Sequence, residues 1–146
     1  MSDAKAPAPL TEAQLRERFL AVPFARYLGI DLELRGDELT LVMPYRQELI
    51  GNVMLPALHG GTLGALLELA AVATVSVRQR QAHLPKTIDI NIDYLRSGRP
   101  VPTFARAKVT RLGRRIASVH AEAWQHERAD PIAALNGHFL LTQADA

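Results

Sequence analysis

Residues 58–77, LHGGTLGALLELAAVATVSV, are apolar almost throughout and constrain the fold more than any other segment. The run is interrupted by Glu68 and falls short of the roughly 20 consecutive apolar residues that a membrane-spanning helix needs. It predicts a buried helix that starts at His59 or Gly60 and continues to about Gln79, covered on nearly every side by a sheet or by a partner. Burial of an unpaired carboxylate is costly, so Glu68 marks a candidate functional site.

The segments before this helix contain one helical pattern and one strand pattern. Residues 11–21 begin with a capping pattern of Thr11 and Gln14 and predict a short amphipathic helix that ends near Pro23. Residues 30–43 alternate apolar and polar side chains on both sides of a Gly-Asp turn, which is typical of a β-hairpin. The segment between this hairpin and the apolar helix has no steady period and is expected to be a loop.

Four strand patterns follow the apolar helix. Residues 87–94 have a strict period of two, with three isoleucines and Tyr94 on one face, and predict a half-buried strand. Three more strand patterns, separated by short turn sequences, lie at about residues 103–111, 115–125 and 131–141. Short connections among these strands favour an antiparallel sheet packed around one central helix, which is an α+β fold.

A chain of 146 residues with 48% hydrophobic and 22% charged residues is typical of one globular domain. We expect this domain over residues 11–146, after a flexible Ala/Pro-rich lead-in over residues 1–10. The formal charge of +2 provides no global basic field for nucleic acid, and the sequence has no cysteine and no HExxH pattern to ligate a metal. Because the N-terminus lacks the apolar run of a secretory signal, we expect a cytoplasmic protein. We also expect no cofactor.

Gly60 and Gly61 stand at the expected start of the apolar helix, where the first backbone N–H groups have no intrahelical partner. Glycine lets a ligand oxygen approach these amides closely, which favours an oxyanion hole. Glu68 lies eight residues beyond Gly60, roughly 12 Å along the helix axis, so one chain cannot place both groups on the same carbonyl. Antiparallel pairing of two such helices brings Glu68 of one chain opposite Gly60 of the other, and therefore predicts an obligate homodimer with two shared sites.

The segment HGGTLGALLELAA, with an acidic residue nine positions after the histidine, resembles the motif of hot-dog fold thioesterases of the PaaI-like (phenylacetic-acid-pathway) type. The family pattern is HGG, several small or apolar residues, then Asp or Glu followed by an Ala-rich helix. TIDINIDYLRSG is similar to the family's strand after the helix, and the resemblance spans roughly residues 24–142. It implies a hot-dog fold, in which an antiparallel sheet wraps around a long central helix.

The resemblance also implies roles for individual residues. The Gly60 amide polarises the thioester carbonyl, with His59 beside it. Glu68 of the partner chain is either the general base that activates water or the nucleophile that forms a mixed anhydride. Thr87 matches a family position where a hydroxyl holds the attacking water, although threonine is also common in strands.

One position departs from the family pattern. Related enzymes often carry Asn or Gln seven residues before the first helix glycine, and this place is Val53 here, with Asn52 one residue earlier. A loop that is longer by one residue and contains Pro56 would bring Asn52 to the site; otherwise its role is absent.

Two basic clusters are candidates for binding the phosphates of coenzyme A, because the planar guanidinium donates paired hydrogen bonds to phosphate. They occur in the turn sequences RSGRP and RLGRR, and their members are Arg96 and Arg99 in the first and Arg111, Arg114 and Arg115 in the second. For each arginine the alternative is a solvated turn residue. Gly61 completes the expected substrate-binding residues.

The leading hypothesis is hydrolysis of a small or medium, aliphatic or aromatic acyl-CoA to free acid and CoA, by a homodimer or a dimer of dimers. A hot-dog hydratase or dehydratase is the second hypothesis, but the His-Phe-Pro and Asp-xxxx-His patterns of such enzymes are absent. A non-catalytic acyl-CoA-binding protein is the third, and it would not need Glu68. No membrane or nucleic-acid partner is expected.

Overall fold

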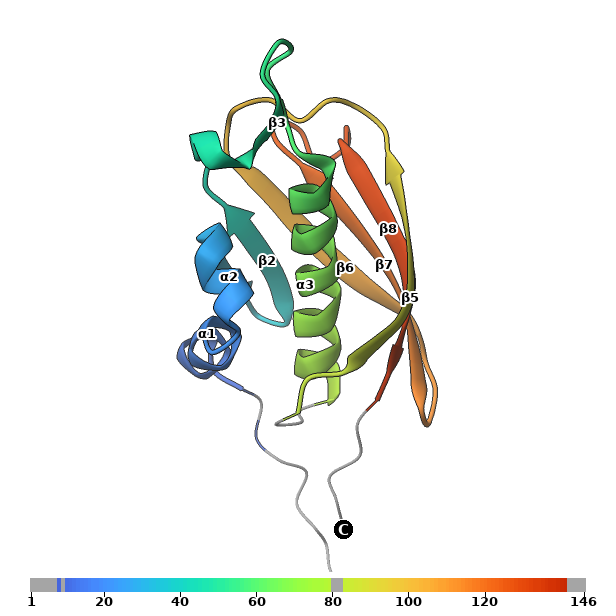
Figure 1. Cartoon of the computed structure of the whole chain (residues 1–146). Helices are drawn as coiled ribbons and strands as arrows, with labels where there is room; N and C mark the ends of the chain where they lie inside the picture. The colour runs from blue at the N-terminus through green and yellow to red at the C-terminus, as the bar shows by residue number, and fades with distance from the viewer. Residues whose placement is uncertain (1–7, 9, 80–82, 142–146) are drawn as a thin grey trace, which may run out of the picture.

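The computed structural model describes residues 8, 10–79 and 83–141, so most of the expected lead-in over residues 1–10 lies outside the described residues. A six-stranded antiparallel sheet has the strand order β1-β2-β6-β7-β8-β5, and β3 and β4 form a separate two-stranded ladder. The long helix α3 lies along one face of the large sheet (Figure 1). The bounds are α1 Glu12–Leu20, α2 Pro23–Leu28, β1 Asp31–Arg35, β2 Glu38–Met43, the 3-10 helix η1 Gln47–Leu49, β3 Ile50–Asn52, β4 Ala57–Leu58, α3 Gly60–Gln79, β5 Lys86–Tyr94, β6 Thr103–Leu112, β7 Ile116–Trp124 and β8 Ala133–Leu140.

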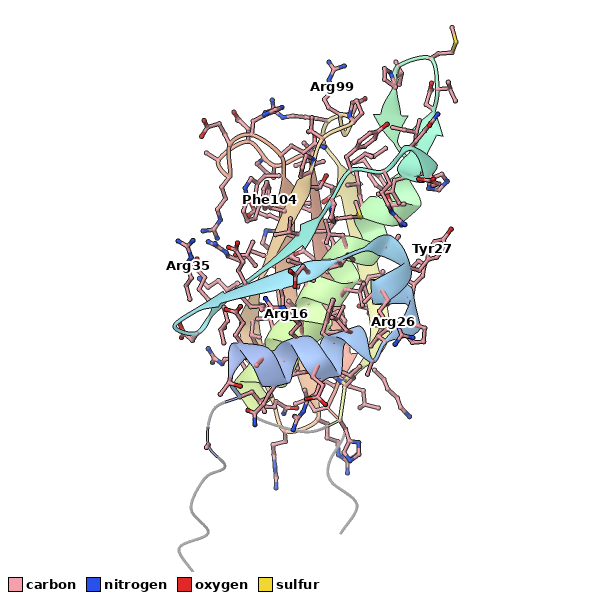
Figure 2. All side chains as sticks on the ribbon, turned by 90° about the vertical axis from the view of Figure 1, so that its left-hand side faces the viewer. Arg16, Arg26, Tyr27, Arg35, Arg99 and Phe104 are labelled. Carbon is pink, nitrogen blue, oxygen red and sulfur yellow. The ribbon has the colours of Figure 1, made fainter. Side chains whose placement is uncertain are left out.

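The core lies between α3 and the large sheet, and this arrangement confirms the predicted α+β fold. One side of α3 packs against β2, β5, β6, β7 and β8, and its fully buried side chains include Leu66 and Leu67. α1 and α2 close the side of this core next to β1 and β2 (Figure 2). By length and composition α3 could also cross a membrane, but the core helices of soluble proteins pass the same test, and half of its most apolar part is buried here.

The opposite side of α3 is only partly covered. Gly61, Ala65, Glu68, Leu69 and Val72 follow one another at helical spacing, and each of them is half-buried or exposed. Within one chain the sheet covers one side of the helix, and cover of the other side by a partner stays a prediction. A partly exposed apolar surface of this kind, with a carboxylate in its middle, is available to a second chain.

The first 60 residues contain one helix that was not predicted and one segment that needs correction. The capping box of Thr11 and Gln14 is present at the start of α1, which ends at Leu20, near Pro23 as predicted, but Pro23 then begins a second helix. Proline fits there because the first turn of a helix needs no N–H donor, and Gly29 ends α2 at a φ of 70°. The segment before α3, expected to be a loop, contains η1 and the β3–β4 hairpin, whose short irregular pairing leaves no readable period.

The period of two in β5 is also interrupted. A bulge between Thr87 and Asp89 shifts the register against β8, and β5 lies at the edge of the sheet. As a result Ile90 and Ile92 are half-buried, whereas Ile88 is 50% exposed. The predicted half-burial therefore applies to the middle of the strand only.

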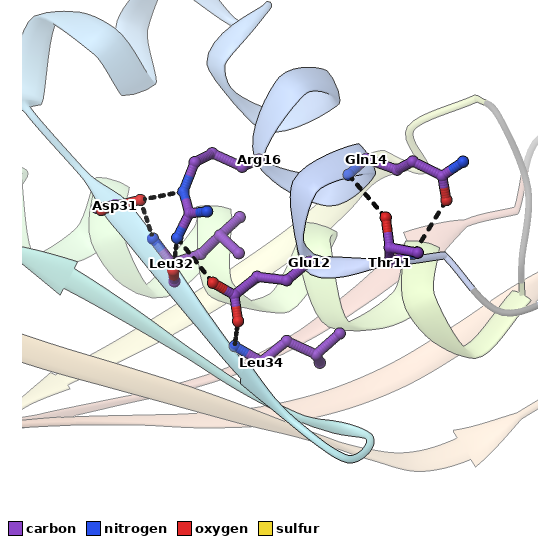
Figure 3. Close-up of polar contacts among 7 residues, drawn as sticks. All are labelled: Thr11, Glu12, Gln14, Arg16, Asp31, Leu32 and Leu34. Atoms are coloured by element: carbon purple, nitrogen blue, oxygen red, sulfur yellow. Dashed lines mark hydrogen bonds and ion pairs between the residues drawn. The ribbon is translucent and has the colours of Figure 1, made fainter.

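A network around Arg16 fixes α1 on β1 (Figure 3). The guanidinium donates to Asp31 Oδ1 at 2.9 Å, to Glu12 Oε1 at 2.9 Å and to the carbonyl oxygen of Leu32 at 2.8 Å. The backbone N–H of Leu34 donates to Glu12, and this bond, followed by the one from Arg16, holds the pKa of Glu12 below its usual value. Arg16 and then the Leu32 N–H likewise hold the pKa of Asp31 below its usual value.

This network predicts a pH dependence of stability. A carboxylate whose pKa is lower in the folded chain stabilises the fold above its unfolded pKa, about 4, and loses this contribution as pH falls through the folded value. We expect Arg16→Gln to flatten the acid side of the stability profile between about pH 5 and 3. Urea unfolding at several pH values measures the effect, with Arg26→Gln on α2 as the matched control. An unchanged acid slope in Arg16→Gln would contradict the assigned role of Arg16.

Candidate active site

His59 lies immediately before α3 and organises its first turn. Its backbone N–H donates to the carbonyl oxygen of Leu49 at 2.8 Å, and its own carbonyl oxygen accepts from the N–H and hydroxyl of Thr62. The ring nitrogen Nδ1 accepts the N–H of Gly61 at 2.8 Å. A neutral imidazole with this bond carries its proton on Nε2, and that nitrogen is left for other partners.

The two glycine amides at the helix start therefore differ. The Gly61 N–H is occupied by His59, whereas the Gly60 N–H has no acceptor among the described residues. A Cβ at Gly61 would come within 2.9 Å of His59 Nδ1, so this contact requires a glycine. Since the positive end of the α3 dipole also points here, Gly60 is the donor that can stabilise a negatively charged oxygen.

Tyr94 at the end of β5 holds Gly60 from the other side and was not identified from the sequence. Its hydroxyl donates to the carbonyl oxygen of Gly60 at 2.9 Å, and a Cβ at Gly60 would meet the Tyr94 ring at 3.1 Å. One turn further, a Cβ at Gly64 would lie 2.8 Å from Ile92 Cδ1. The absence of side chains at these two helix positions lets β5 approach α3 closely.

These two contacts set the register between α3 and β5. Four helical residues rise about 6 Å, and two strand residues rise about 6.6 Å. Every four residues further along α3 therefore correspond to two residues back along β5. Extension of this register places Glu68 level with Ile90 and brings Thr87 closer to Glu68 than to Gly60. By this register Thr87 lies three strand residues, about 10 Å, beyond the level of Glu68, and both residues are displaced along α3 from Gly60.

Glu68 itself is half-exposed, not buried as expected, and makes no hydrogen bond or ion pair within the described part of the chain. Its neighbours on the helix surface are the half-buried Ala65, Leu69 and Val72. Burial of this carboxylate therefore requires something outside the single chain.

Asn52 ends β3 in the hairpin before α3. Its Oδ1 accepts the N–H groups of Met54 at 3.0 Å and Leu55 at 3.2 Å and so closes the turn of the hairpin. The neighbouring Gly51 lies against His59, since a Cβ there would be 2.7 Å from His59 Cα. The hairpin thus lies next to the helix start, and the side-chain oxygen of Asn52 is occupied by the two hydrogen bonds of the turn.

Arg96 and Arg99 lie at the same end of the sheet as Gly60. Both line a cavity of about 420 Å³, in which Arg96 forms an ion pair with Asp130 at 3.4 Å. A second cavity of about 450 Å³ is lined by Gly60 and Tyr94 and shares Arg96 with the first. The expected phosphate-binding pair is therefore next to the expected carbonyl-binding amide.

The other arginine cluster is remote from this end. Arg111, Arg114 and Arg115 line a cavity of about 450 Å³ around the β6–β7 turn. β6 has 10 residues and spans about 33 Å, and the β6–β7 turn lies at the opposite end of the sheet from the start of α3 (Figure 1). Within one chain, this cluster and Gly60 do not share a site. No group of three or more metal-ligating side chains is found among residues 8, 10–79 and 83–141.

Comparisons with known proteins agree on one family. The family model described as Thioesterase superfamily matches residues 55–132. The medium/long-chain acyl-CoA thioesterase YigI of Escherichia coli (strain K12) is 30% identical over 122 residues, which cover 73% of this chain and 78% of the relative. A solved structure from Chromobacterium violaceum is 36% identical with a TM-score of 0.71 and covers 91% of this chain and 97% of its own. A phenylacetic acid degradation-related protein from Ralstonia eutropha JMP134, 20% identical with a TM-score of 0.71 and coverage of 94% of both chains, has the same fold.

The cap at the helix start can be tested by its effect on stability. We expect His59→Ala to lower the free energy of unfolding by about 0.5–2 kcal/mol, because the Gly61 N–H loses its acceptor. His59→Asn should retain most of the stability, since asparagine is an effective cap. Urea unfolding measures both variants. Equal losses in the two would show instead that the imidazole acts by packing on Gly51.

Proposed function

The chain belongs to the thioesterase superfamily and is a thioester hydrolase, and from this premise we propose that it hydrolyses acyl-CoA at a site shared between two identical chains. The resemblance to hot-dog fold thioesterases and the predicted hot-dog fold are both confirmed by the family match and by the solved structures. The observation that carries the proposed site is the free Gly60 amide at the start of α3, with Glu68 unpaired two turns further along. Family membership favours hydrolysis over the hydratase and binding-protein alternatives.

In the proposed reaction, the thioester carbonyl oxygen accepts the Gly60 N–H at the positive end of α3. Negative charge develops on this oxygen as the carbonyl carbon is attacked, and a fixed amide donor stabilises it. Glu68 of the partner chain either takes the proton from the attacking water or attacks the carbonyl carbon directly and forms a mixed anhydride. In the first route the carbon–sulfur bond breaks, the free acid forms, and the proton taken by Glu68 passes to the CoA thiolate. In the second route the thiolate leaves as the anhydride forms and takes a proton from water, and a water molecule then hydrolyses the anhydride, which releases the free acid and regenerates the Glu68 carboxylate.

The homodimer is supported by two unpartnered features on neighbouring elements. The uncovered side of α3 presents Ala65, Leu69 and Val72 around Glu68, and β5 has a free edge because it ends the sheet. An antiparallel arrangement of two α3 helices about a two-fold axis would cover these apolar side chains and would bring Glu68 of one chain opposite Gly60 of the other, with Thr87 on the strand beside Glu68.

The same apolar side of α3 supports an acyl substrate. Once a second chain covers Ala65, Leu69 and Val72, the space beside Glu68 is lined by aliphatic side chains, and such a lining favours an alkyl chain over a charged group. The E. coli relative is named for medium- and long-chain acyl-CoA. We therefore place the substrates of this chain in the medium class that the sequence prediction also includes.

Loss of the carboxylate tests the assignment. We expect Glu68→Gln to lower kcat on acyl-CoA substrates at least about 10²-fold, because the amide can neither accept the proton nor attack the carbonyl. Release of free thiol from a panel of straight-chain and aromatic acyl-CoA substrates measures the effect, and Glu17→Gln on α1 is the matched control. Unchanged turnover in a variant that stays dimeric would exclude Glu68.

The shared site makes a separate prediction for mixed dimers. Glu68→Gln chains retain Gly60, and Gly60→Ala chains retain Glu68 but place a methyl group against the Tyr94 ring. When the two inactive variants are unfolded together and refolded, half of the dimers contain both chains and one complete site each, so about a quarter of the wild-type activity should return. No return of activity, with mixed dimers verified by mass spectrometry, would contradict a site built from two chains.

A further inference from the structure

The face of the sheet opposite α3 carries Trp124, the sole tryptophan of the chain. Trp124 on β7 is paired with Phe104 on β6, and their rings stack with centroids 5.9 Å apart and an interplanar angle of 23°. The neighbouring Ala105 and Ala123 are fully buried toward α3, so the two rings occupy the outer face. Both aromatic side chains are half-buried, and they form a flat apolar surface in an otherwise polar region.

Arginine side chains surround these rings. The guanidinium groups of Arg106 and Arg128 lie over the Trp124 ring at 5.5 and 5.6 Å from its centroid. Arg106 also donates to Thr40 Oγ1 at 3.1 and 2.8 Å and forms an ion pair with Glu38. We use the name arginine–tryptophan pocket for the resulting hollow of about 320 Å³, which is lined by Glu33, Arg35, Glu38, Thr40, Phe104, Arg106 and Trp124.

Glu33 and Glu38 balance Arg35 and Arg106 in the lining of this pocket, and Arg128 above the Trp124 ring adds one positive charge in excess. Burial and then the nearby charge of Arg128 lower the pKa of Arg106, and Arg35 acts in the same direction, whereas Glu38 opposes the change. Arg128 is 58% exposed and lies 3.7 Å from Glu38, which is already paired with Arg106. A phosphate beside Arg128 would relieve its repulsion with Arg106, and the exposed Arg128 side chain would exchange its contact with Glu38 for the phosphate.

Trp124 ends β7, so the pocket lies next to the loops that line the cavities near the proposed active site. The cavity beside Gly60 shares Arg96 with the cavity beside Arg99, and the wall of the latter includes Gln125, the residue next to Trp124. The backbone N–H of Arg99 donates to Gln125 Oε1 at 2.9 Å, so the two loops are tied together. Figure 2 shows Arg99 at this end and Phe104 further along the sheet.

We propose that the arginine–tryptophan pocket binds the adenosine 3′,5′-bisphosphate end of the CoA thioester. This inference rests on the proposed acyl-CoA hydrolysis and extends it to the recognition of the carrier. The purine packs on the surface of Phe104 and Trp124, and its phosphates accept hydrogen bonds from Arg128 and Arg35. The pantetheine arm then follows the cavities beside Arg99 and Arg96 to the Gly60 amide.

The pattern of groups fits this ligand better than a carboxylate-bearing peptide. Side-by-side aromatic rings favour a planar partner, and several guanidinium groups around one edge favour phosphate, which accepts bidentate hydrogen bonds from arginine. Thr40 and Glu38 hold Arg106 in place, and this fixed cation leaves less side-chain freedom to lose on binding.

The tryptophan provides a direct measurement, because all indole fluorescence of the chain comes from Trp124. Titration of the wild-type protein with adenosine 3′,5′-bisphosphate and with CoA should change this fluorescence saturably, whereas pantetheine alone should not. Arg128→Ala should weaken both responses about tenfold, and Arg26→Ala on α2 should leave them unchanged. No saturable response to CoA, or the same affinity in Arg128→Ala, would overturn the proposal.

Kinetics separate this inference from the proposed function. In Arg128→Ala we expect KM for acyl-CoA to rise about tenfold while kcat stays close to wild type, and hydrolysis of the matching acyl-pantetheine to be unaffected. An equal loss on both substrates would contradict a nucleotide site. If the wild-type protein hydrolyses no thioester, the proposed function fails, and the fluorescence titration still decides separately whether the pocket binds the nucleotide.

Discussion

The close approach of β5 to α3 is the contact on which the proposed site depends. It is possible because Gly60 and Gly64 have no side chains where Tyr94 and Ile92 lie against the helix. The contact fixes the level of each β5 residue along α3, and it holds the first carbonyl of the helix through the Tyr94 hydroxyl. The position of the proposed catalytic groups therefore follows from packing between a helix and an edge strand.

At the helix start, one structural hydrogen bond leaves a single amide for the proposed role of oxyanion donor. Two adjacent glycine amides stand at the start of the helix. The Gly61 N–H donates to His59 Nδ1, and the Gly60 N–H has no acceptor among the described residues. A second free amide would offer water another binding position in the absence of substrate. With Gly61 occupied, the dipole of α3 and the remaining N–H act on a single point, which suits a carbonyl oxygen.

Periodicity predicted α3 and the strands well, because long segments of regular structure bury regular patterns of side chains. It missed the β3–β4 hairpin and the helix at Pro23, since these are short and depend on tertiary contacts such as that of Gly51 with His59. The HGG motif identified the helix start but not which amide is free. Turn sequences identified two arginine clusters as equivalent, although the length of β6 places them at opposite ends of the sheet.

Trp124 was missed for a related reason. On β7 it has the same alternation phase as polar side chains such as His120 and Glu122, and the sequence alone does not show that Phe104 and Arg106 from the preceding strand lie beside it. Strand pairing brings these residues together, and the loop that follows β7 adds Arg128 to the same ring. The sheet thus presents two faces: the inner face supports α3 and the proposed hydrolytic groups, and the outer face carries the pocket proposed to recognise the part of the carrier that does not react.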